Sequence, residues 1–392
     1  MPAKVIVKVK PELLRWARER AGLPQEDLAR KVGSKETPAP VAQWEQTGEI
    51  PLNKLEQIAQ RTHAPFAVLF LDQPPEEKLP IQDFRNNRGH RPSLGLLQSI
   101  YDAQLRQTWL STHLQSEGQA PLVFVGSATV ETSPEAIGQK IRESLAIDTF
   151  ERSRQPDIEK AVLWMMDRLN DAGILTQRSG IVGQNTRRKL DPDEFKGFAL
   201  ADPWAPLIFI NGRDWPASQM FTIGHELAHI WLGRSALPDG AWFERAEDPA
   251  ENWCNRVAAE VLMPTDEIKV MWRAGEEPRA MARSLSKHFK MSTLALLVRS
   301  RALGLITENA FKAARELDEK DFRESEHPRP KSTGGDFYAT AKSRLGKRFI
   351  QEVLVSTLEG KTLYSEAFEL LGTRKTSVFY GLRDKYLPGG AP

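Results

Sequence analysis

The sequence predicts an α+β protein that is mostly helical, with an all-helical N-terminal region, a central region built on a small sheet and a helical C-terminal region. Apolar residues recur at helical spacing over most of the 392 residues. Short β-like runs gather between residues 173 and 210, immediately before another helical pattern. A chain of this length exceeds what one hydrophobic core usually organises, so we expect two or three domains.

The composition is that of an ordinary folded chain. Hydrophobic residues make up 40% and charged residues 27% of the sequence, which argues against a disordered or coiled-coil protein. A single cysteine and an N-terminus without a signal-peptide pattern lead us to expect a cytoplasmic location. No apolar run approaches the ~20 residues that span a bilayer. Because the net charge is only +2, any contact with DNA needs a local surface.

The N-terminal region reads as a compact module of short helices at residues 1–72. Apolar residues at helical spacing between residues 11 and 70 are separated by glycine and proline. A proline-rich, charged stretch follows at 72–80, so residues 73–132 are expected to form a linker with a long amphipathic helix. That helix begins near residue 93, and a strand is predicted at 121–125.

The central mixed region is predicted at residues 133–270. Ser133 followed by Pro134 is typical of an N-cap that opens a helix, and a second helix is expected at 158–172. Three short strands follow. The strands are predicted at 173–176, 197–200 and 206–210. A helix follows at 215–232, with Asp214 as its N-cap and Gly233 as the residue after its last turn.

The rest of the chain returns to helical patterns. Residues 271–325 contain a turn-separated helix pair, and residues 326–392 are expected to form a C-terminal helical extension. The pair at 287–301 has a helix-turn-helix rhythm, yet core packing explains its leucines without nucleic acid. The basic run at 342–348 is read as a solvated helix face.

A metal site is predicted on the helix that carries His225, Glu226 and His229. Residues four apart lie on one face of a helix, so both imidazoles can reach one ion while Glu226 lies beside them. Catalytic zinc takes three protein ligands and keeps its fourth position for water. A third ligand must therefore come from farther along the chain.

Glu251 is the preferred third ligand. It lies in the first turn of a helix that Asp248 opens and Pro264 ends, with Asn255 one turn later, where it could orient a histidine. The same position suits a capping-box glutamate that reaches back to the Asp248 amide, and this alternative stays open. Glu260 is the reserve ligand, but nine residues after Glu251 it should face roughly the opposite side of the helix.

This ligand set predicts peptide hydrolysis. Zinc would polarise the scissile carbonyl, and Glu226 would accept a proton from water and pass it to the leaving amine. The run at 207–210 is interpreted either as a strand edge that pairs with an extended peptide or as a core strand. Cys254 is expected to pack as a small hydrophobe. No residue is assigned to stabilise the oxyanion.

Two segments resemble the ImmA/IrrE metallopeptidases, namely residues 221–229, which contain the histidine pair, and residues 251–264, which begin with Glu251 and end with Pro264. The resemblance implies a zincin-like fold in which His225, His229 and Glu251 bind zinc and Glu226 is the catalytic base. It also implies a protein substrate, since better-studied members cleave transcriptional repressors in stress responses. Val257 departs from the common phenylalanine, which concerns packing more than chemistry.

The N-terminal module resembles the Xre/Cro-type helix-turn-helix family at residues 14–18, 25–29 and 44–51. In that family the second helix of the pair enters the major groove, which here corresponds to residues 38–46. The best DNA-contact candidates are Ser34, Lys35, Thr37 and Gln43. Basic residues barely outnumber acidic ones over residues 1–72, so a protein-binding role for this module stays equally open.

A regulator is the competing hypothesis. In that case the chain would be a DNA-binding transcription factor or antitoxin-like partner whose zinc domain senses or scaffolds. Glu226 favours the enzyme, because a scaffold does not need a carboxylate between its two histidines.

Overall fold

The computed structural model describes residues 5–33, 39–84, 92–238, 240, 248–324 and 336–387. The chain divides into two compact units. The first consists of residues 1–80 and 89–98, and the second of residues 81–88 and 99–392. Each unit is described by itself. Helices predominate in both, and the strands form small sheets, as an α+β protein requires.

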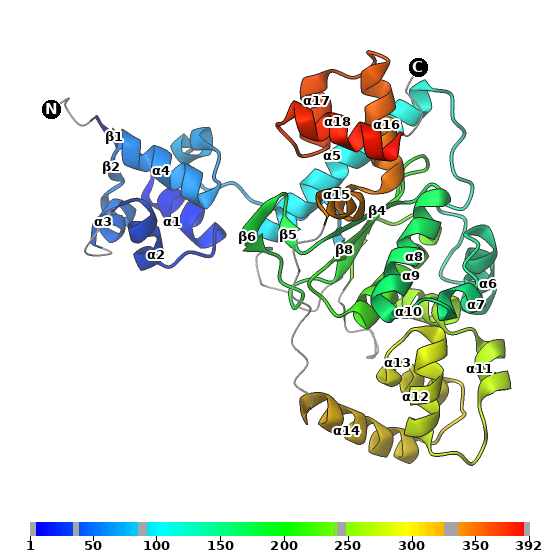
Figure 1. Ribbon diagram of the computed structural model, residues 1–392. Coiled ribbons are helices and arrows are strands. Elements are labelled where there is room, and N and C mark those ends of the chain that lie inside the picture. Colours follow the sequence, from blue (N-terminus) through cyan, green and yellow to red (C-terminus); the bar gives the residue numbers. More distant parts are fainter. Residues whose placement is uncertain are drawn as a thin grey trace. The chain divides into compact units, whose positions relative to one another are not determined.

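The first unit consists mainly of short helices, but it is not all-helical as predicted. A two-stranded antiparallel sheet accompanies four α-helices and a 3-10 helix (Figure 1). The core residues Leu14, Leu28, Val41 and Leu55 come one from each helix. The elements are β1 Ile6–Lys8, α1 Pro11–Arg20, α2 Gln25–Lys31, α3 Ala39–Thr47, β2 Glu49–Pro51, α4 Leu52–Thr62 and η1 Phe66–Phe70.

A buried polar network joins three of these helices. Glu45 on α3 is only 3% exposed and accepts hydrogen bonds from Arg18 on α1 at 2.6 and 3.1 Å. Gln25 on α2 donates to the same carboxylate at 2.7 Å. A buried carboxylate needs such partners, because desolvation would otherwise outweigh its contribution to stability. The network therefore fixes how α1, α2 and α3 pack.

The second unit is built on a five-stranded sheet in the order β3-β9-β7-β8-β4. Strand β8 is fully buried and pairs with β7 on one side, antiparallel, and with β4 on the other, parallel. Its two edges are thus both occupied, so the prediction of a free peptide-binding edge at 207–210 is wrong and the core-strand interpretation is confirmed. The strands are β3 Gln82–Asp83, β4 Leu175–Ser179, β7 Gly197–Leu200, β8 Leu207–Asn211 and β9 Ala236–Leu237.

Helices pack against this sheet and bury its apolar side chains. α9 contacts β7, β8 and α8, and α10 packs against α9 and α6 (Figure 1). Ser133 caps α6, as predicted, by accepting a hydrogen bond from the Ala136 amide at 3.3 Å. The helices are α6 Pro134–Ser144, α7 Thr149–Ser153, α8 Ile158–Asp171, α9 Pro216–Leu232 and α10 Pro249–Leu262.

Two local predictions are wrong. Residues 121–125 form a turn instead of a strand: the Val125 amide donates to the Leu122 carbonyl at 3.2 Å, and Val123 is 90% exposed. Their apolar character suggested a strand, but no neighbouring strand is available to pair with them in the described structure. The N-cap of α9 is Trp215 and not Asp214, whose carboxylate lies 3.5 Å from the Lys196 ammonium.

The remaining helices extend the second unit. α5 Leu94–Ser116 is a long helix, as predicted, although its first residues belong to the first unit. α15 packs on β4, and a short hairpin joins β5 Ile181–Val182 to β6 Asn185–Lys189. No helix in the described ranges is long and apolar enough to cross a membrane. The other helices are α11 Thr265–Met271, α12 Pro278–Phe289, α13 Thr293–Ala302, α14 Glu308–Glu324, α15 Phe337–Leu345, α16 Lys347–Leu358, α17 Tyr364–Leu370 and α18 Thr376–Tyr386.

Candidate metal centre

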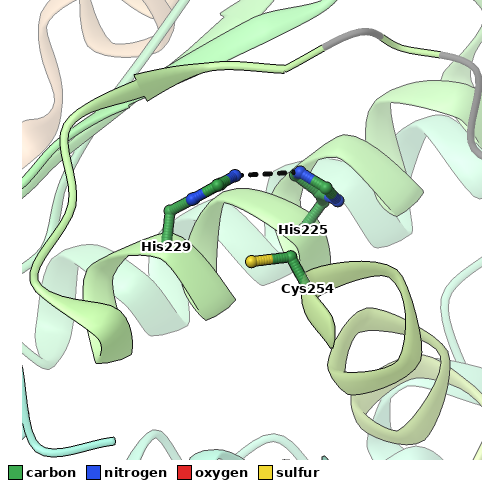
Figure 2. A group of neighbouring side chains, drawn as sticks. All are labelled: His225, His229 and Cys254. Carbon is green, nitrogen blue, oxygen red and sulfur yellow. Dashed lines mark hydrogen bonds between the residues drawn. The ribbon is translucent and has the colours of Figure 1, made fainter. Parts of the chain in front are cut away.

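Helix α9 brings two histidines together inside the protein. His225 and His229 are fully buried, and their Nε2 atoms lie 3.0 Å apart (Figure 2). Gly224 lets α10 approach this helix, because a Cβ at that position would lie 3.0 Å from Leu262 and 3.3 Å from Ala258. The helix ends at Gly233, whose φ of 68° is the left-handed conformation that glycine adopts without strain.

Glu251 points its carboxylate at the histidine pair. Its Oε1 lies 3.0 Å from Nε2 of His229, and its Oε2 lies 3.3 Å from Nε2 of His225. Asp248 caps α10 with its own side chain, which accepts a hydrogen bond from the Ala250 amide at 2.7 Å. Burial would raise the pKa of Glu251, but its close contacts with both histidines hold the pKa of this carboxyl below its usual value. The carboxylate is therefore ionised beside the imidazoles.

Asn255 contacts the opposite side of one imidazole. Its Oδ1 lies 2.9 Å from Nδ1 of His225. An amide oxygen only accepts hydrogen bonds, so this contact places the proton on Nδ1. The Nε2 atom, which faces His229 and Glu251, then presents a lone pair that an ion can bind. Nδ1 of His229 is buried and has no hydrogen-bond partner within the described part of the chain. Burial lowers the pKa of His229, which favours the neutral imidazole that a metal binds.

The three converging side chains fit a zinc ion. Ligands at 2.0–2.1 Å around a tetrahedral ion are separated from one another by about 3.3 Å. The donor atoms of His225, His229 and Glu251 are 3.0 to 3.3 Å apart. Two nitrogens and one carboxylate are also a donor set typical of catalytic zinc, with a fourth position left for water.

Glu226 lies buried next to this donor set. Both of its carboxylate oxygens lack a hydrogen-bond partner among the residues that the structure places. Burial, with a contribution from the negative charge of Glu251, raises its pKa well above the usual value. Across from it, Gly197 on β7 has no side chain, and a Cβ there would come within 3.7 Å of Oε1 of Glu226. An unpaired carboxylate with a raised pKa suits proton transfer.

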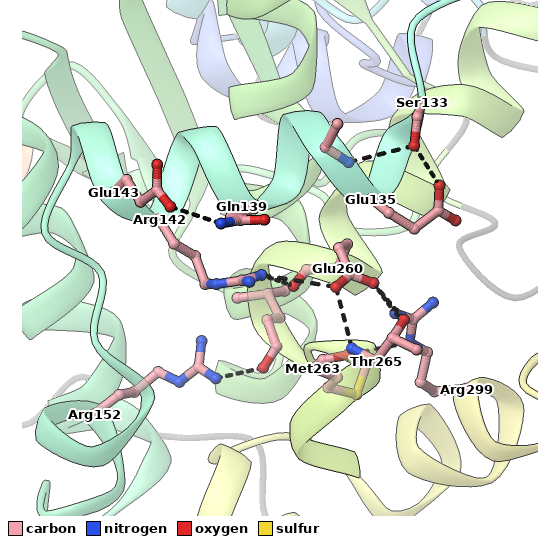
Figure 3. Close-up of polar contacts among 12 residues, drawn as sticks. Ser133, Glu135, Gln139, Arg142, Glu143, Arg152, Glu260, Met263, Thr265 and Arg299 are labelled. Carbon is pink, nitrogen blue, oxygen red and sulfur yellow. Dashed lines mark hydrogen bonds and ion pairs between the residues drawn. The ribbon is translucent and has the colours of Figure 1, made fainter. Parts of the chain in front are cut away.

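Glu260 lies apart from the histidines and belongs to a separate network. Its carboxylate forms an ion pair with Arg299 and accepts hydrogen bonds from the amide and hydroxyl of Thr265 at 3.1 and 2.7 Å (Figure 3). Its backbone carbonyl accepts a hydrogen bond from Arg142 at 2.6 Å. These contacts engage both carboxylate oxygens away from the site.

Two neighbours of the site have no assigned role in the sequence-based prediction. Cys254 is fully buried, and its Sγ lies within 4.8 Å of a ring nitrogen of each histidine (Figure 2). Its position three residues after Glu251 on the same helix could have indicated in the sequence that it lies near the histidines. Burial raises the pKa of the Cys254 thiol well above its usual value, so it stays protonated. The ring of Phe84, beside β3, stacks on His229 with centroids 6.1 Å apart; nothing in the sequence pattern indicated this contact.

Of the four DNA-contact candidates, the structure describes only Gln43. Ser34, Lys35 and Thr37 lie outside the described residues. Gln43 is exposed on α3, in the middle of the segment predicted to enter a groove.

Comparison with known proteins identifies the central segment. Residues 169–301 match the family model of the IrrE N-terminal-like domain, and residues 345–384 match a domain of unknown function. The radiation response metalloprotease IrrE of Deinococcus radiodurans is 37% identical over 102 residues, which cover 24% of this chain and 31% of that protein. The protein of the same name from Deinococcus deserti is 36% identical over 101 residues, covering 24% of this chain and 36% of that protein.

The matched chain spans about a third of the length of these curated relatives. The family match nonetheless contains the whole histidine pair and the helix with Glu251. Residues 169–301 are therefore an IrrE N-terminal-like domain, which supports a relationship of this segment to the ImmA/IrrE metallopeptidases.

Proposed function

We propose that this protein is a zinc-dependent endopeptidase that cleaves a protein substrate. The observation that carries the proposal is the convergence of the His225, His229 and Glu251 donor atoms next to the buried carboxylate of Glu226. A family match to metallopeptidases supports the same conclusion.

Each residue has a distinct part in the proposed reaction. His225, His229 and Glu251 hold the ion, and Asn255 fixes the ring of His225 through Nδ1. Zinc, when bound, supplies the Lewis acidity that polarises a carbonyl and acidifies water. Glu226 accepts the proton of the attacking water and delivers it to the leaving amine. Its buried position keeps it free of competing hydrogen bonds from the described residues.

The proposed substrate is a transcriptional repressor. The relatives' names describe a radiation-response metalloprotease, and repressor cleavage would connect proteolysis to such a response. The N-terminal module would supply location or partner choice, through DNA or through a protein. Exposure of Gln43 on α3 supports a contact surface there. We place the reaction in the reducing cytoplasm, where a lone buried Cys254 remains a thiol.

The same exposed face of α3 supports the second candidate function. In it, the chain acts as a DNA-binding regulator or antitoxin-like protein, and the metal centre only senses or scaffolds. Such a protein needs the three metal ligands but not Glu226. Loss of the Glu226 carboxylate would therefore abolish the function of an endopeptidase but not that of a regulator.

Substitution of Glu226 separates them. The Glu226→Gln variant and the wild type would be co-expressed with repressors encoded by neighbouring genes, with cleavage followed by mass spectrometry and zinc content by elemental analysis. We expect the variant to keep its zinc and to lose cleavage. Glu135→Gln, at an exposed carboxylate on α6, is the matched control and should cleave normally. A biological output that survives Glu226→Gln would exclude proteolysis as the function.

A further inference from the structure

A cavity of about 250 Å³ lies in the second unit, apart from the metal centre. Its walls come from α5, from β4 at the sheet edge opposite β3, and from the C-terminal helices α15, α17 and α18. None of His225, Glu226, His229 and Glu251 lines it. The cavity is lined by charged, polar and apolar side chains. Some of the charged and polar groups lack an ion-pair or hydrogen-bond partner in the described structure.

Two arginines line this cavity without a carboxylate partner. Arg106 on α5 donates to the Leu370 carbonyl at 3.1 Å and to Oε1 of Gln177 at 3.3 Å. Arg344 on α15 has no hydrogen bond or ion pair with any described residue. Burial lowers the pKa of both arginines; the charge of Asp102 raises the pKa of Arg106, and the charge of Arg344 lowers it by a smaller amount. Both arginines are half-buried. A partly desolvated charge without an ion pair is costly, so an anion between them would relieve the repulsion.

Gln177 adds an unused donor to the same cavity. Its side chain is 1% exposed, and its Nε2 has no hydrogen-bond partner among the residues that are placed. Native proteins rarely leave a buried amide unsatisfied, which indicates a missing acceptor. Because Oε1 of Gln177 accepts from Arg106, the free amide nitrogen and the guanidinium belong to one polar end of the cavity.

Two carboxylates also line the cavity, but neither forms an ion pair with Arg106 or Arg344 in the described structure. Asp102 lies near Arg106 without forming an ion pair within 4.0 Å in the described structure, and burial raises the pKa of Asp102. Glu369 is exposed to solvent on α17. The interior of the polar end therefore carries an excess of hydrogen-bond donors and positive charge.

Much of the remaining cavity lining is apolar. Its lining includes the side chains of Phe209, Phe337, Leu345, Leu371, Val378 and Leu382. Small-molecule sites combine such a wall with a few convergent polar groups that fix orientation. We propose that this cavity binds a small organic anion, with a carboxylate between Arg106, Arg344 and Gln177 and an apolar body against the C-terminal helices.

This site gives the C-terminal segment a role. Residues 345–384 match a domain of unknown function, and they supply Leu345, Leu371, Val378 and Leu382 to the cavity lining. The ligand would also touch the catalytic region through one strand. Gln177 and Ser179 of β4 line the cavity, while Arg178 between them donates to Gln219 on α9 at 2.6 Å and pairs with Glu159 on α8. The cavity and the metal-binding helix thus share β4.

Binding of two simple carboxylates tests the proposal. The full-length, zinc-loaded protein would be titrated calorimetrically with phenylacetate and hexanoate, with neutral phenylacetamide and inorganic phosphate as controls. We expect saturable binding of at least one carboxylate, and no comparable binding of the amide or of phosphate. Charge-assisted hydrogen bonds predict that Arg344→Gln weakens binding about tenfold to a hundredfold. Ala341→Phe, which fills the cavity from α15, should abolish it.

Matched measurements guard against a trivial loss of folding. Arg154→Gln changes an exposed arginine on the α7 C-cap and should bind like the wild type. Thermal unfolding without ligand should show Arg344→Gln at least as stable as the wild type, because an unpaired charge has been removed. The proposal is overturned if neither carboxylate binds the wild type at millimolar concentration. It also fails if the amide or phosphate binds equally well, or if both cavity variants retain full affinity.

Discussion

Asn255 and His225 form a contact of 2.9 Å between Oδ1 and Nδ1, one helical turn beyond Glu251 on α10. The same helix therefore carries the carboxylate that faces both imidazoles and the amide that contacts one of them. Because Gly224 allows α10 to lie close to α9, both functions reach His225 from a rigid element. A site held by packed helices positions its donors more precisely than one built on loops.

Loss of the Asn255 contact should weaken zinc binding without abolishing it. Removing a hydrogen-bond partner of a metal-bound histidine typically costs about 10- to 100-fold in affinity. We expect Asn255→Ala to show such a loss in competition with a chelator, and Glu251→Ala to show a larger one. Arg256→Ala, at an exposed neighbour on α10, is the control and should bind zinc normally. Equal zinc affinity of Asn255→Ala and wild type would contradict the orienting role.

Zinc removal should destabilise the second unit. Binding to the folded state alone adds about 2.7 kcal/mol of stability when free zinc is 100 times its dissociation constant. We expect chelation to lower the unfolding temperature and added zinc to restore it in the wild type and in Glu226→Gln. His229→Ala should lose this response. An unfolding temperature that ignores zinc in the wild type would mean that no ion binds at the histidines.

The network around Glu260 should matter for stability more than for chemistry. Arg299 is 8% exposed, pairs with Glu260 and donates to the Met263 carbonyl at 3.1 Å, at the end of α10 (Figure 3). Arg299→Met leaves the buried carboxylate without its cation, so we expect a loss of about 3–5 kcal/mol in the free energy of unfolding. The double variant Arg299→Met and Glu260→Met should recover part of it. Urea denaturation measures the free energy of unfolding of both variants. Equal stability of Arg299→Met and the wild type would contradict a stabilising role for the ion pair.

Gly197 should not tolerate a side chain. A Cβ on this β7 residue would lie 2.5 Å from Cγ2 of Thr222 and 2.6 Å from the Phe209 carbonyl oxygen. Gly197→Ala must therefore separate β7 from α9 or β8, and overpacking of this kind costs about 1–3 kcal/mol. Gly224→Ala meets its neighbours at 3.0 Å or more and should cost less. Thermal unfolding ranks the two variants, and the reverse order would contradict the packing described for the site.

DNA binding by the N-terminal module can be tested by its salt dependence. A phosphate contact from Lys35 predicts that Lys35→Ala reduces the slope of affinity against salt by about one, for any sequence. A base contact from Gln43 predicts weaker binding only to the preferred site. Lys78→Ala, at an exposed lysine outside the helices, is the control. Shift assays on the upstream promoter measure these effects, and unaltered binding in both variants would dismiss the groove assignment.

The sequence alone predicted that His225 and His229 share one face of α9, that α9 ends at Gly233 and that Asp248 opens the next helix. These features depend only on residues a few positions apart. The same spacing left Glu251 between capping and metal binding. Only the packing of α10 on α9 decided which way that carboxylate points. Strand pairing decided that residues 207–211 are internal to the sheet and that 121–125 are a turn. The contact of Phe84 with His229 and the cavity between Arg106 and Arg344 join residues far apart in sequence, which no local pattern encodes.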